Sequence, residues 1–179
     1  MSGHGYKVPP RSIRNIREIA EEVRKIVGDP RKNIGVFLEI LLFQGKLDVV
    51  EDNDRRLARD VEAVFIPNDQ CIRLRNRDYE AVITGSNRRS LFTFWHEFGH
   101  MILGHERTFN REESQEHKAY EDSEWQANTF AGEILMPTLD VILTFATPST
   151  FHGVAKHAIF AGVQRQRRSA PAEQGAQHL

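Results

Sequence analysis

The chain contains one cysteine, no long apolar run and almost no excess of charge of either sign. Because Cys71 has no second cysteine to pair with, an internal disulfide framework is excluded and a reducing compartment is expected. Apolar runs stay well short of the ~20 residues that a membrane-spanning helix needs, and the start lacks the apolar core of a signal peptide. The formal net charge of −1 gives no electrostatic reason to expect binding to nucleic acid. We therefore expect a cytoplasmic protein that acts away from membranes and without direct contact to DNA or RNA.

The length of 179 residues and the hydrophobic content of 40% are typical of one globular domain with short extensions. Glycines and a proline pair near the start predict a flexible leader at residues 1–11. A single domain is expected over residues 12–169. The polar residues 170–179 predict a disordered tail.

Periodic apolar positions predict several helices. In residues 13–27 the apolar side chains recur at helical spacing after Ser12, which can cap the helix start. Residues 34–43 are almost entirely apolar and predict a second helix, packed into the core. Near the end, residues 139–145 and 154–163 predict two more helices, and the arginine-rich stretch that follows is typical of a solvent-exposed helix end.

Four short runs of β-forming residues predict strands at residues 47–50, 61–66, 71–75 and 81–83. A Pro-Asn-Asp turn at residues 67–69 predicts that the second and third strands pair as an antiparallel hairpin. In the third strand, apolar residues alternate with Arg73 and Arg75, which predicts one buried and one solvent-facing side. These patterns together predict an α+β fold in which a small, mostly antiparallel sheet packs against helices.

The stretch FWHEFGH at residues 94–100 places two histidines four residues apart, with a glutamate directly after the first. On a helix His96 and His100 lie one turn apart on the same face, so both imidazoles can reach one metal ion. Glu97 lies about 100° around the helix, where it can accept a proton from a metal-bound water. This is the H-E-x-x-H arrangement of zinc peptidases.

The motif is predicted to lie on a buried helix over residues 88–103. Ser86 and Asn87 can cap its start, no proline interrupts it, and Gly104 can end it. Its side chains are apolar nearly all the way round, so the polar motif residues need partners, and a metal ion meets that need.

A catalytic zinc site usually has three protein ligands, so the chain must supply one more. Residues 122–135 predict the next helix, and helical phase separates its carboxylates. Glu124 points along the inward face, Glu133 points roughly opposite, and Glu121 is the alternative to Glu124. Asn128 lies one turn after Glu124, where it can bond to a ligating histidine or to a neighbouring helix.

The polar residues 105–120 predict a surface loop beside the site. His105 stands five residues after His100, whereas the metzincin pattern places its third histidine six residues after the second, so that family is disfavoured. His105, His117 and Tyr120 remain candidates for supporting roles.

Two blocks of the chain carry a family resemblance. RSLFTFWHEFGH at residues 89–100 resembles the R-x-x-F-T-x-x-H-E-x-G-H block of the ImmA/IrrE-type metallopeptidases. EWQANTFAGEILMP at residues 124–137 resembles the E-x-x-A-N-x-F-A-x-x-L-L-M-P block of the same family. Both blocks occur in order, and the looser resemblance extends over residues 13–170.

The resemblance implies a zincin-like core with a gluzincin-like site. His96, His100 and Glu124 would be the metal ligands, with Glu97 as the general base. The ion would be Zn²⁺, although Mn²⁺ or another divalent ion also suits this ligand set.

Members of the family typically cleave or otherwise inactivate helix-turn-helix repressors. The expected function is therefore a zinc-dependent endopeptidase that cleaves a helix-turn-helix transcriptional repressor and so relieves repression. The alternative is a non-proteolytic, antitoxin-like binding protein with a structural metal site, which would normally be closed by a fourth protein ligand.

Overall fold

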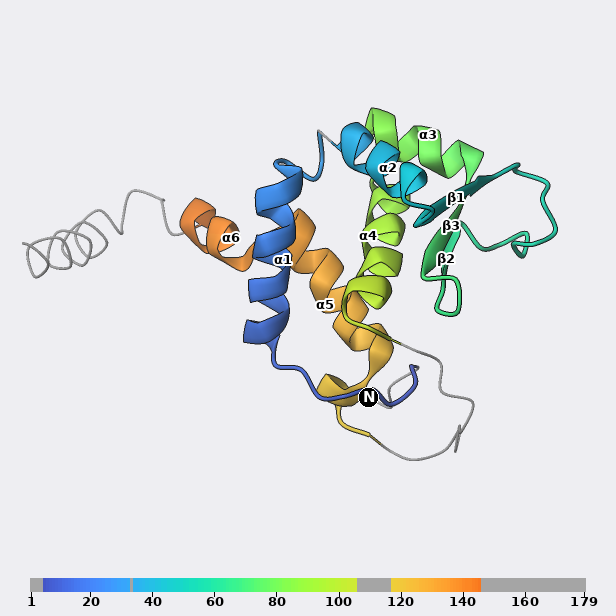
Figure 1. The fold of residues 1–179 in the computed structure, drawn as a ribbon. Helices are drawn as coiled ribbons and strands as arrows, with labels where there is room; N and C mark the ends of the chain where they lie inside the picture. Colours follow the sequence, from blue (N-terminus) through green and yellow to red (C-terminus); the bar gives the residue numbers. More distant parts are fainter. Residues whose placement is uncertain (1–4, 33, 106–116, 146–179) are drawn as a thin grey trace, which may run out of the picture. The chain divides into compact units, whose positions relative to one another are not determined.

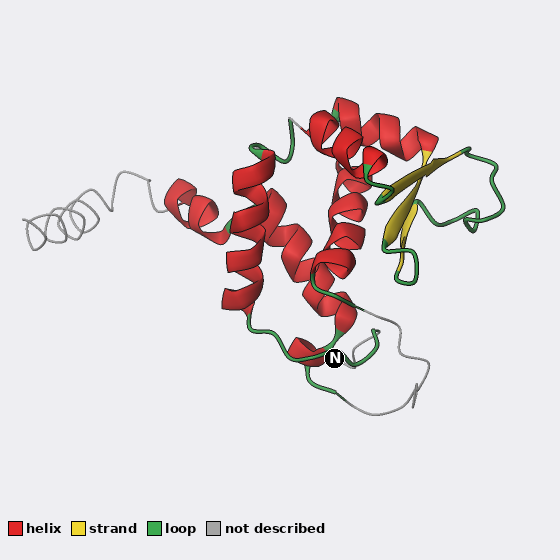
Figure 2. Cartoon of the chain, in the orientation of Figure 1, coloured by secondary structure: helices red, strands yellow, loops and turns green. Residues whose placement is uncertain are grey.

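The computed structural model describes residues 5–32, 34–105 and 117–145 (Figure 1). Within these residues the chain forms six α-helices, one short 3₁₀ helix and three β-strands (Figure 2), so the predicted α+β class is confirmed. The chain divides into two units, Met1–Pro137 and Thr138–Leu179. The predicted helix at residues 154–163, the arginine-rich stretch after it and the predicted tail at residues 170–179 lie outside the described residues.

Five of the six described helices lie where the sequence predicts a helix, and α3 is the exception. In chain order they are α1 (Ile13–Val27), α2 (Ile34–Phe43), α3 (Asn76–Thr84), α4 (Arg88–Ile102), α5 (Ser123–Leu135) and α6 (Thr138–Phe145). Ser12 caps α1, as expected, because its hydroxyl accepts a hydrogen bond from the Asn15 backbone N–H at 3.1 Å. Helix α6 is the described part of the second unit. No helix in the described part of the chain is long and apolar enough to cross a membrane.

The three strands are β1 (Leu47–Val50), β2 (Ala63–Ile66) and β3 (Cys71–Arg75), in the spatial order β1-β3-β2. Strands β2 and β3 pair antiparallel across the predicted turn, which confirms the hairpin. Strand β1, however, pairs parallel to β3, so the sheet is mixed and the expectation of a mostly antiparallel sheet was wrong. The long loop between β1 and β2 lets the chain return before the hairpin begins, and no local pattern in the sequence reports that direction.

The predicted strand at residues 81–83 was also wrong, because these residues lie in α3. Buried Asp78 and Val82 are spaced four residues apart, whereas Ile83 is exposed, which is a helical pattern rather than an alternating one. A run of three apolar residues is too short to separate the two periods.

Arg75 corrects a third expectation. It was predicted on the solvent-facing side of β3 but is 1% exposed. Its guanidinium donates hydrogen bonds to the backbone carbonyls of Asp52, Leu57, Ala58 and Val61. These acceptors lie in the loop between β1 and β2, so the arginine ties that loop to the sheet.

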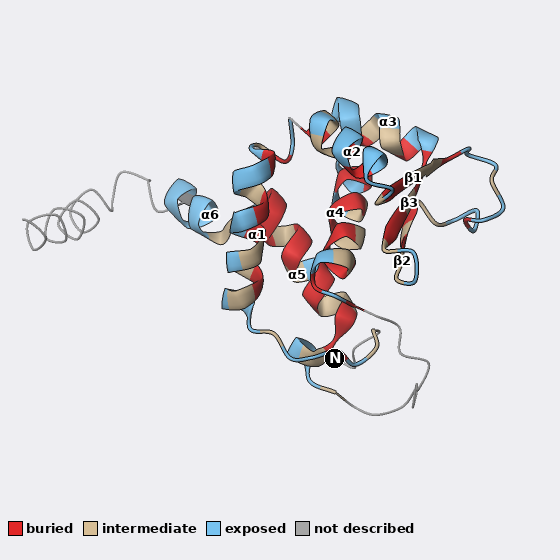
Figure 3. Cartoon of the chain, in the orientation of Figure 1, coloured by how far each residue is buried: buried red, intermediate tan, exposed pale blue. Residues whose placement is uncertain are grey.

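Helix α4 lies at the centre of the first unit. It packs against α5 on one side and against α3, β2 and β3 on the other, while α1 packs against α5 (Figure 1). About half of α4 and most of α5 are buried (Figure 3), and the core includes Phe94, Trp95, Phe98 and Phe130. The motif helix is therefore held from two sides, as its apolar composition predicts.

Residues 5–11, predicted to belong to a flexible leader, run along the start of α5. The Val8 backbone N–H donates to the Glu121 carbonyl at 2.8 Å, and the Ser123 N–H donates to the Tyr6 carbonyl at 3.1 Å. The Arg11 N–H donates to the Tyr120 carbonyl at 3.0 Å, and Val8 is buried. We call residues 5–11 the N-terminal segment below.

Candidate metal centre

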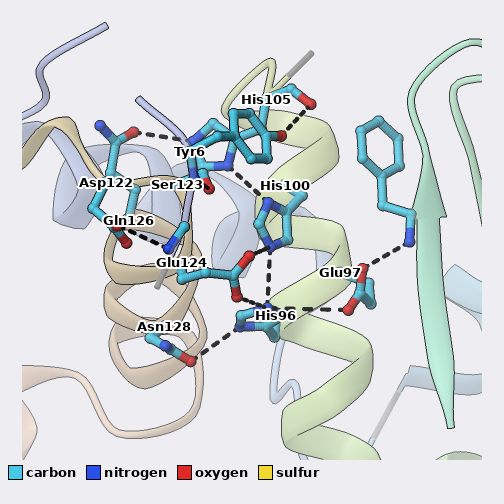
Figure 4. A network of polar contacts seen from close by, with 12 residues as sticks. Tyr6, His96, Glu97, His100, His105, Asp122, Ser123, Glu124, Gln126 and Asn128 are labelled. Atoms are coloured by element: carbon cyan, nitrogen blue, oxygen red, sulfur yellow. Dashed lines mark hydrogen bonds and ion pairs between the residues drawn. The ribbon is translucent and has the colours of Figure 1, made fainter. Parts of the chain in front are cut away.

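Helix α4 carries the two motif histidines on one face. It begins after Asn87, whose Oδ1 accepts a hydrogen bond from the Arg89 backbone N–H at 2.9 Å. It ends before Gly104, whose φ of +71° suits a residue without a Cβ. Because one helical turn separates them, His96 and His100 project side by side toward α5 (Figure 4).

Helix α5 presents Glu124 in its first turn. The helix begins after Asp122, whose carboxylate accepts a hydrogen bond from the Trp125 backbone N–H at 2.7 Å. Burial alone would raise the pKa of Asp122, but hydrogen bonds from Trp125, His117 and Gly5 outweigh it and lower the pKa below its usual range. The cap therefore holds its charge and fixes the turn that carries Glu124.

Gly99 allows the two helices to approach closely. A Cβ built on Gly99 would lie 3.1 Å from Phe130 Cδ1 and 3.3 Å from both the Cα and the carbonyl oxygen of Ala127. Gly99 stands between the two histidines, and Ala127 stands one turn after Glu124. The absence of a side chain at Gly99 therefore brings Glu124 within reach of both imidazoles.

Three predicted ligands converge on one point. The Nε2 atoms of His96 and His100 are 3.0 Å apart. Glu124 Oε2 lies 3.2 Å from His96 Nε2, and its Oε1 lies 3.5 Å from His100 Nε2. One donor atom from each residue lies within 4.8 Å of the other two.

This donor set fits a divalent metal ion. Two ring nitrogens and a carboxylate so close together are electron-rich atoms that need a shared proton or cation between them. Two imidazoles and one carboxylate are a common ligand set of catalytic zinc. Among the described residues the cluster offers three ligands, which leaves a coordination position for water or substrate.

The charges of the centre support one another. Burial alone lowers the pKa of His96, but the hydrogen bond to Glu124 and the negative charges of Glu97 and Glu124 outweigh it, so the pKa of His96 is raised. The hydrogen bond from His96 lowers the pKa of Glu124 against the opposing effect of burial. The carboxylate is therefore ionised and available as a ligand near neutral pH.

Glu97 lies beside the cluster but outside it. Its Oε1 is 4.0 Å from His96 Nε2. Its Oε2 accepts a hydrogen bond from the Phe65 backbone N–H of β2 at 2.7 Å. The sheet thus holds one oxygen of Glu97 in place while the other faces the histidines, as the helical phase predicts.

The structure separates the alternative carboxylates. Glu121 lies in the 3₁₀ helix η1 (Ala119–Glu121), where its Oε2 accepts a hydrogen bond from the Lys118 backbone N–H. Glu133 is buried and forms an ion pair with Arg17 of α1 at 3.1 Å. Glu124 is the carboxylate beside the histidines.

Asn128 contacts a histidine of the centre. Its Oδ1 lies 3.0 Å from His96 Nδ1, one of the two arrangements considered for it. An Nδ1–H donated to this oxygen leaves Nε2 as the His96 nitrogen that faces the cluster, where a bound ion would take the place of its proton.

His105, His117 and Tyr120, the candidates from the predicted loop, lie outside the three-ligand cluster. His105 is buried, with Nδ1 2.9 Å from His100 Nδ1, so it stands behind a ligand rather than in the cluster. His117 bonds to Asp122 at 2.9 Å, and Tyr120 has an exposed side chain. Residues 106–116 of this loop lie outside the described residues.

Two contacts near the centre were not predicted from the sequence. Gln126 is fully buried behind His105, and the Phe65 backbone N–H holds Glu97. The phase of α5 does turn Gln126 inward, since its neighbour Ala127 is buried, but its partners come from distant segments. A backbone donor leaves no signal in the sequence at all.

Comparison with known families agrees with the two sequence blocks. Residues 84–158 match the family Peptidase_M78, described as the IrrE N-terminal-like domain. No curated protein and no solved structure gave a match. The match covers the whole of α4 and α5, and it confirms the predicted resemblance to the ImmA/IrrE family.

Proposed function

We propose that this protein, whose residues 84–158 match the IrrE N-terminal-like domain, is a zinc-dependent endopeptidase that cleaves a helix-turn-helix repressor. The observation that carries the proposal is the convergence of His96, His100 and Glu124 beside Glu97. The choice of a repressor as substrate comes from the family resemblance.

His96, His100 and Glu124 would hold the ion. When bound, a divalent ion supplies a Lewis acid that activates water and polarises the scissile carbonyl. Asn128 keeps the Nε2 of His96 available by accepting the Nδ1–H. The arrangement of donors on two helices makes the centre depend on their packing.

Glu97 acts as the general base and acid. Its Oε1 accepts a proton from the attacking water and then delivers that proton to the nitrogen of the leaving amine. The Phe65 N–H keeps Oε2 from turning toward the histidines, so the glutamate serves as a base instead of a further ligand.

The sheet offers a place for an extended substrate segment. Among the described strands β2 lies at an edge, and its Phe65 contacts Glu97 directly. Extended peptides commonly add to such edges through backbone hydrogen bonds. A segment of the repressor lying along β2 would pass beside the proposed base.

The test uses the Glu97→Gln variant to capture substrate from the native cells. The captured proteins are then incubated with zinc-loaded wild-type protein and analysed by intact mass. Conversion of a captured helix-turn-helix protein into two defined fragments by the wild type, but not by Glu97→Gln, is the expected result. A captured protein that stays whole with both would favour the non-proteolytic binding protein instead.

A further inference from the structure

A buried chain of polar contacts lies behind His100, on the side away from Glu124 (Figure 4). It contains His105 and Gln126, which are 1% and 0% exposed. The proposed peptidase chemistry uses neither side chain. Buried polar side chains are costly unless their hydrogen bonds are complete, so the direction of each bond can be worked out.

The two neighbours of the Gln126 amide nitrogen determine the orientation of this amide. Its Nε2 lies 2.9 Å from the Pro9 carbonyl oxygen and 2.8 Å from the Tyr120 carbonyl oxygen. Both neighbours are acceptors, so the amide must present its two N–H groups to them. The reversed amide would place Gln126 Oε1 against the carbonyl oxygens of Pro9 and Tyr120, with no hydrogen between them. Gln126 Oε1 therefore faces His105 as an acceptor.

The proton positions of two histidines follow. His105 Nε2 lies 3.1 Å from Gln126 Oε1 and must donate to it. In a neutral ring the His105 Nδ1 is then an acceptor. It lies 2.9 Å from His100 Nδ1, which must supply the proton between them. His100 is thereby left with a bare Nε2, and this is the atom that faces His96 and Glu124.

We propose that His105 is a positioning residue that holds His100 in the tautomer able to bind a metal. Gln126 sets the direction of the hydrogen bonds that join it to His105 and His100. This inference rests on the proposed metal centre. A doubly protonated or reversed His105 would move the proton of His100 to Nε2 and block the ligand atom.

The N-terminal segment covers these buried polar contacts and supplies two of their hydrogen-bonding groups. It supplies the Pro9 carbonyl, and the Tyr6 hydroxyl donates to the His105 carbonyl oxygen at 3.0 Å. The Tyr6 ring also meets the His105 ring edge-on, with centroids 6.5 Å apart. The two ligands are thus supported differently: His100 by buried groups and His96 by the exposed Asn128, which water can replace.

The test begins with the metal-free wild-type protein labelled with ¹⁵N-histidine. Long-range ¹H–¹⁵N spectra distinguish protonated from unprotonated ring nitrogens, and the His100 signals are assigned by loss in His100→Asn. The expected result is a protonated Nδ1 and an unprotonated Nε2 on His100. A proton on His100 Nε2 in the folded wild type would overturn the proposal without any variant of His105.

The second arm compares His105→Phe with Asn128→Ala. Phenylalanine keeps a ring but cannot accept the His100 proton, so we expect mixed His100 tautomers and zinc affinity about tenfold to a hundredfold weaker by chelator competition. Asn128→Ala should leave His100 unchanged and weaken zinc by less than about tenfold. An unchanged tautomer and affinity in folded His105→Phe would refute the positioning role.

These readouts need no substrate. Failure of cleavage with the expected tautomer would count against the proposed function and leave the role of His105 standing. Cleavage together with a proton on His100 Nε2 would support the proposed function and count against the role of His105.

Discussion

Arg75 shows at the scale of one residue how a buried charge can order a distant site. Among the described residues no carboxylate pairs with its guanidinium, which donates its hydrogen bonds to carbonyls of the loop that leads into β2. That strand supplies the Phe65 N–H to Glu97. The loop, the strand and the proposed base are therefore linked through one side chain.

Replacing Arg75 by methionine should lower the free energy of unfolding by about 2–4 kcal/mol, because several buried carbonyls lose their donors. Arg73→Met is the matched control on the same strand. Arg73 is paired with Asp48 at 2.8 Å but is only half-buried, so its loss should cost less than about 1 kcal/mol. Urea unfolding measures both, and equal losses would contradict the assigned role.

The raised pKa of the Cys71 thiol leads to a prediction about its reactivity. Burial raises the pKa of the Cys71 thiol above its usual range, so the reactive thiolate is scarcer in the folded chain than in the unfolded one at the same pH. Reaction with a thiol reagent at pH 8 should be at least about tenfold slower in native protein than in urea. Similar rates in the two states would show that the thiol is exposed.

At the scale of elements, the meeting of α4 and α5 decides whether the ligands can converge. A methyl group at Gly99 must displace Phe130 or the Ala127 backbone by a few tenths of an ångström. Gly99→Ala should therefore separate Glu124 from the histidines and weaken zinc binding by about tenfold or more.

Gly132→Ala is the control on α5. A Cβ at Gly132 meets nothing within 4 Å, so this change should keep zinc affinity and stabilise the helix by about 0.5–1 kcal/mol. Chelator competition and urea unfolding distinguish the two variants. Equal zinc affinity in Gly99→Ala and wild type would show that the close approach is unnecessary.

The sequence predicted the elements that local patterns encode. Helix starts at Ser12 and Asn87, the β2–β3 hairpin and the inward phase of Glu124 all follow from capping, turn and periodicity rules. The parallel direction of β1, the helix α3 and the burial of Arg75 depend on partners far along the chain. A local pattern cannot report such partners.

At the scale of the whole molecule, α1 and the end of α5 meet within the first unit. Arg24 of α1 donates to the Ile134 carbonyl at 2.7 Å, and Arg17 pairs with Glu133. The N-terminal segment continues this contact along the start of α5. The motif helices are therefore supported by residues far from either sequence block.

Gly5 tests this support. A Cβ there would lie 2.6 Å from Ser123 Oγ and 2.8 Å from the Glu124 backbone nitrogen. Gly5→Val should displace the N-terminal segment, increase hydrogen exchange across residues 119–126 and weaken zinc binding about tenfold. Gly35→Ala, at a site with nothing within 4 Å, is the control and should change neither. Unaltered exchange in Gly5→Val would show that the segment does not support the centre.

In the proposed centre, His96, His100 and Glu124 hold one catalytic ion beside Glu97. The most direct measurement is zinc titration of metal-free wild type, His96→Ala, Glu124→Ala and Glu97→Gln. We expect one tightly bound zinc per chain in wild type and Glu97→Gln, with tight binding lost in His96→Ala and Glu124→Ala. Wild-type zinc affinity in His96→Ala or Glu124→Ala would contradict the centre itself.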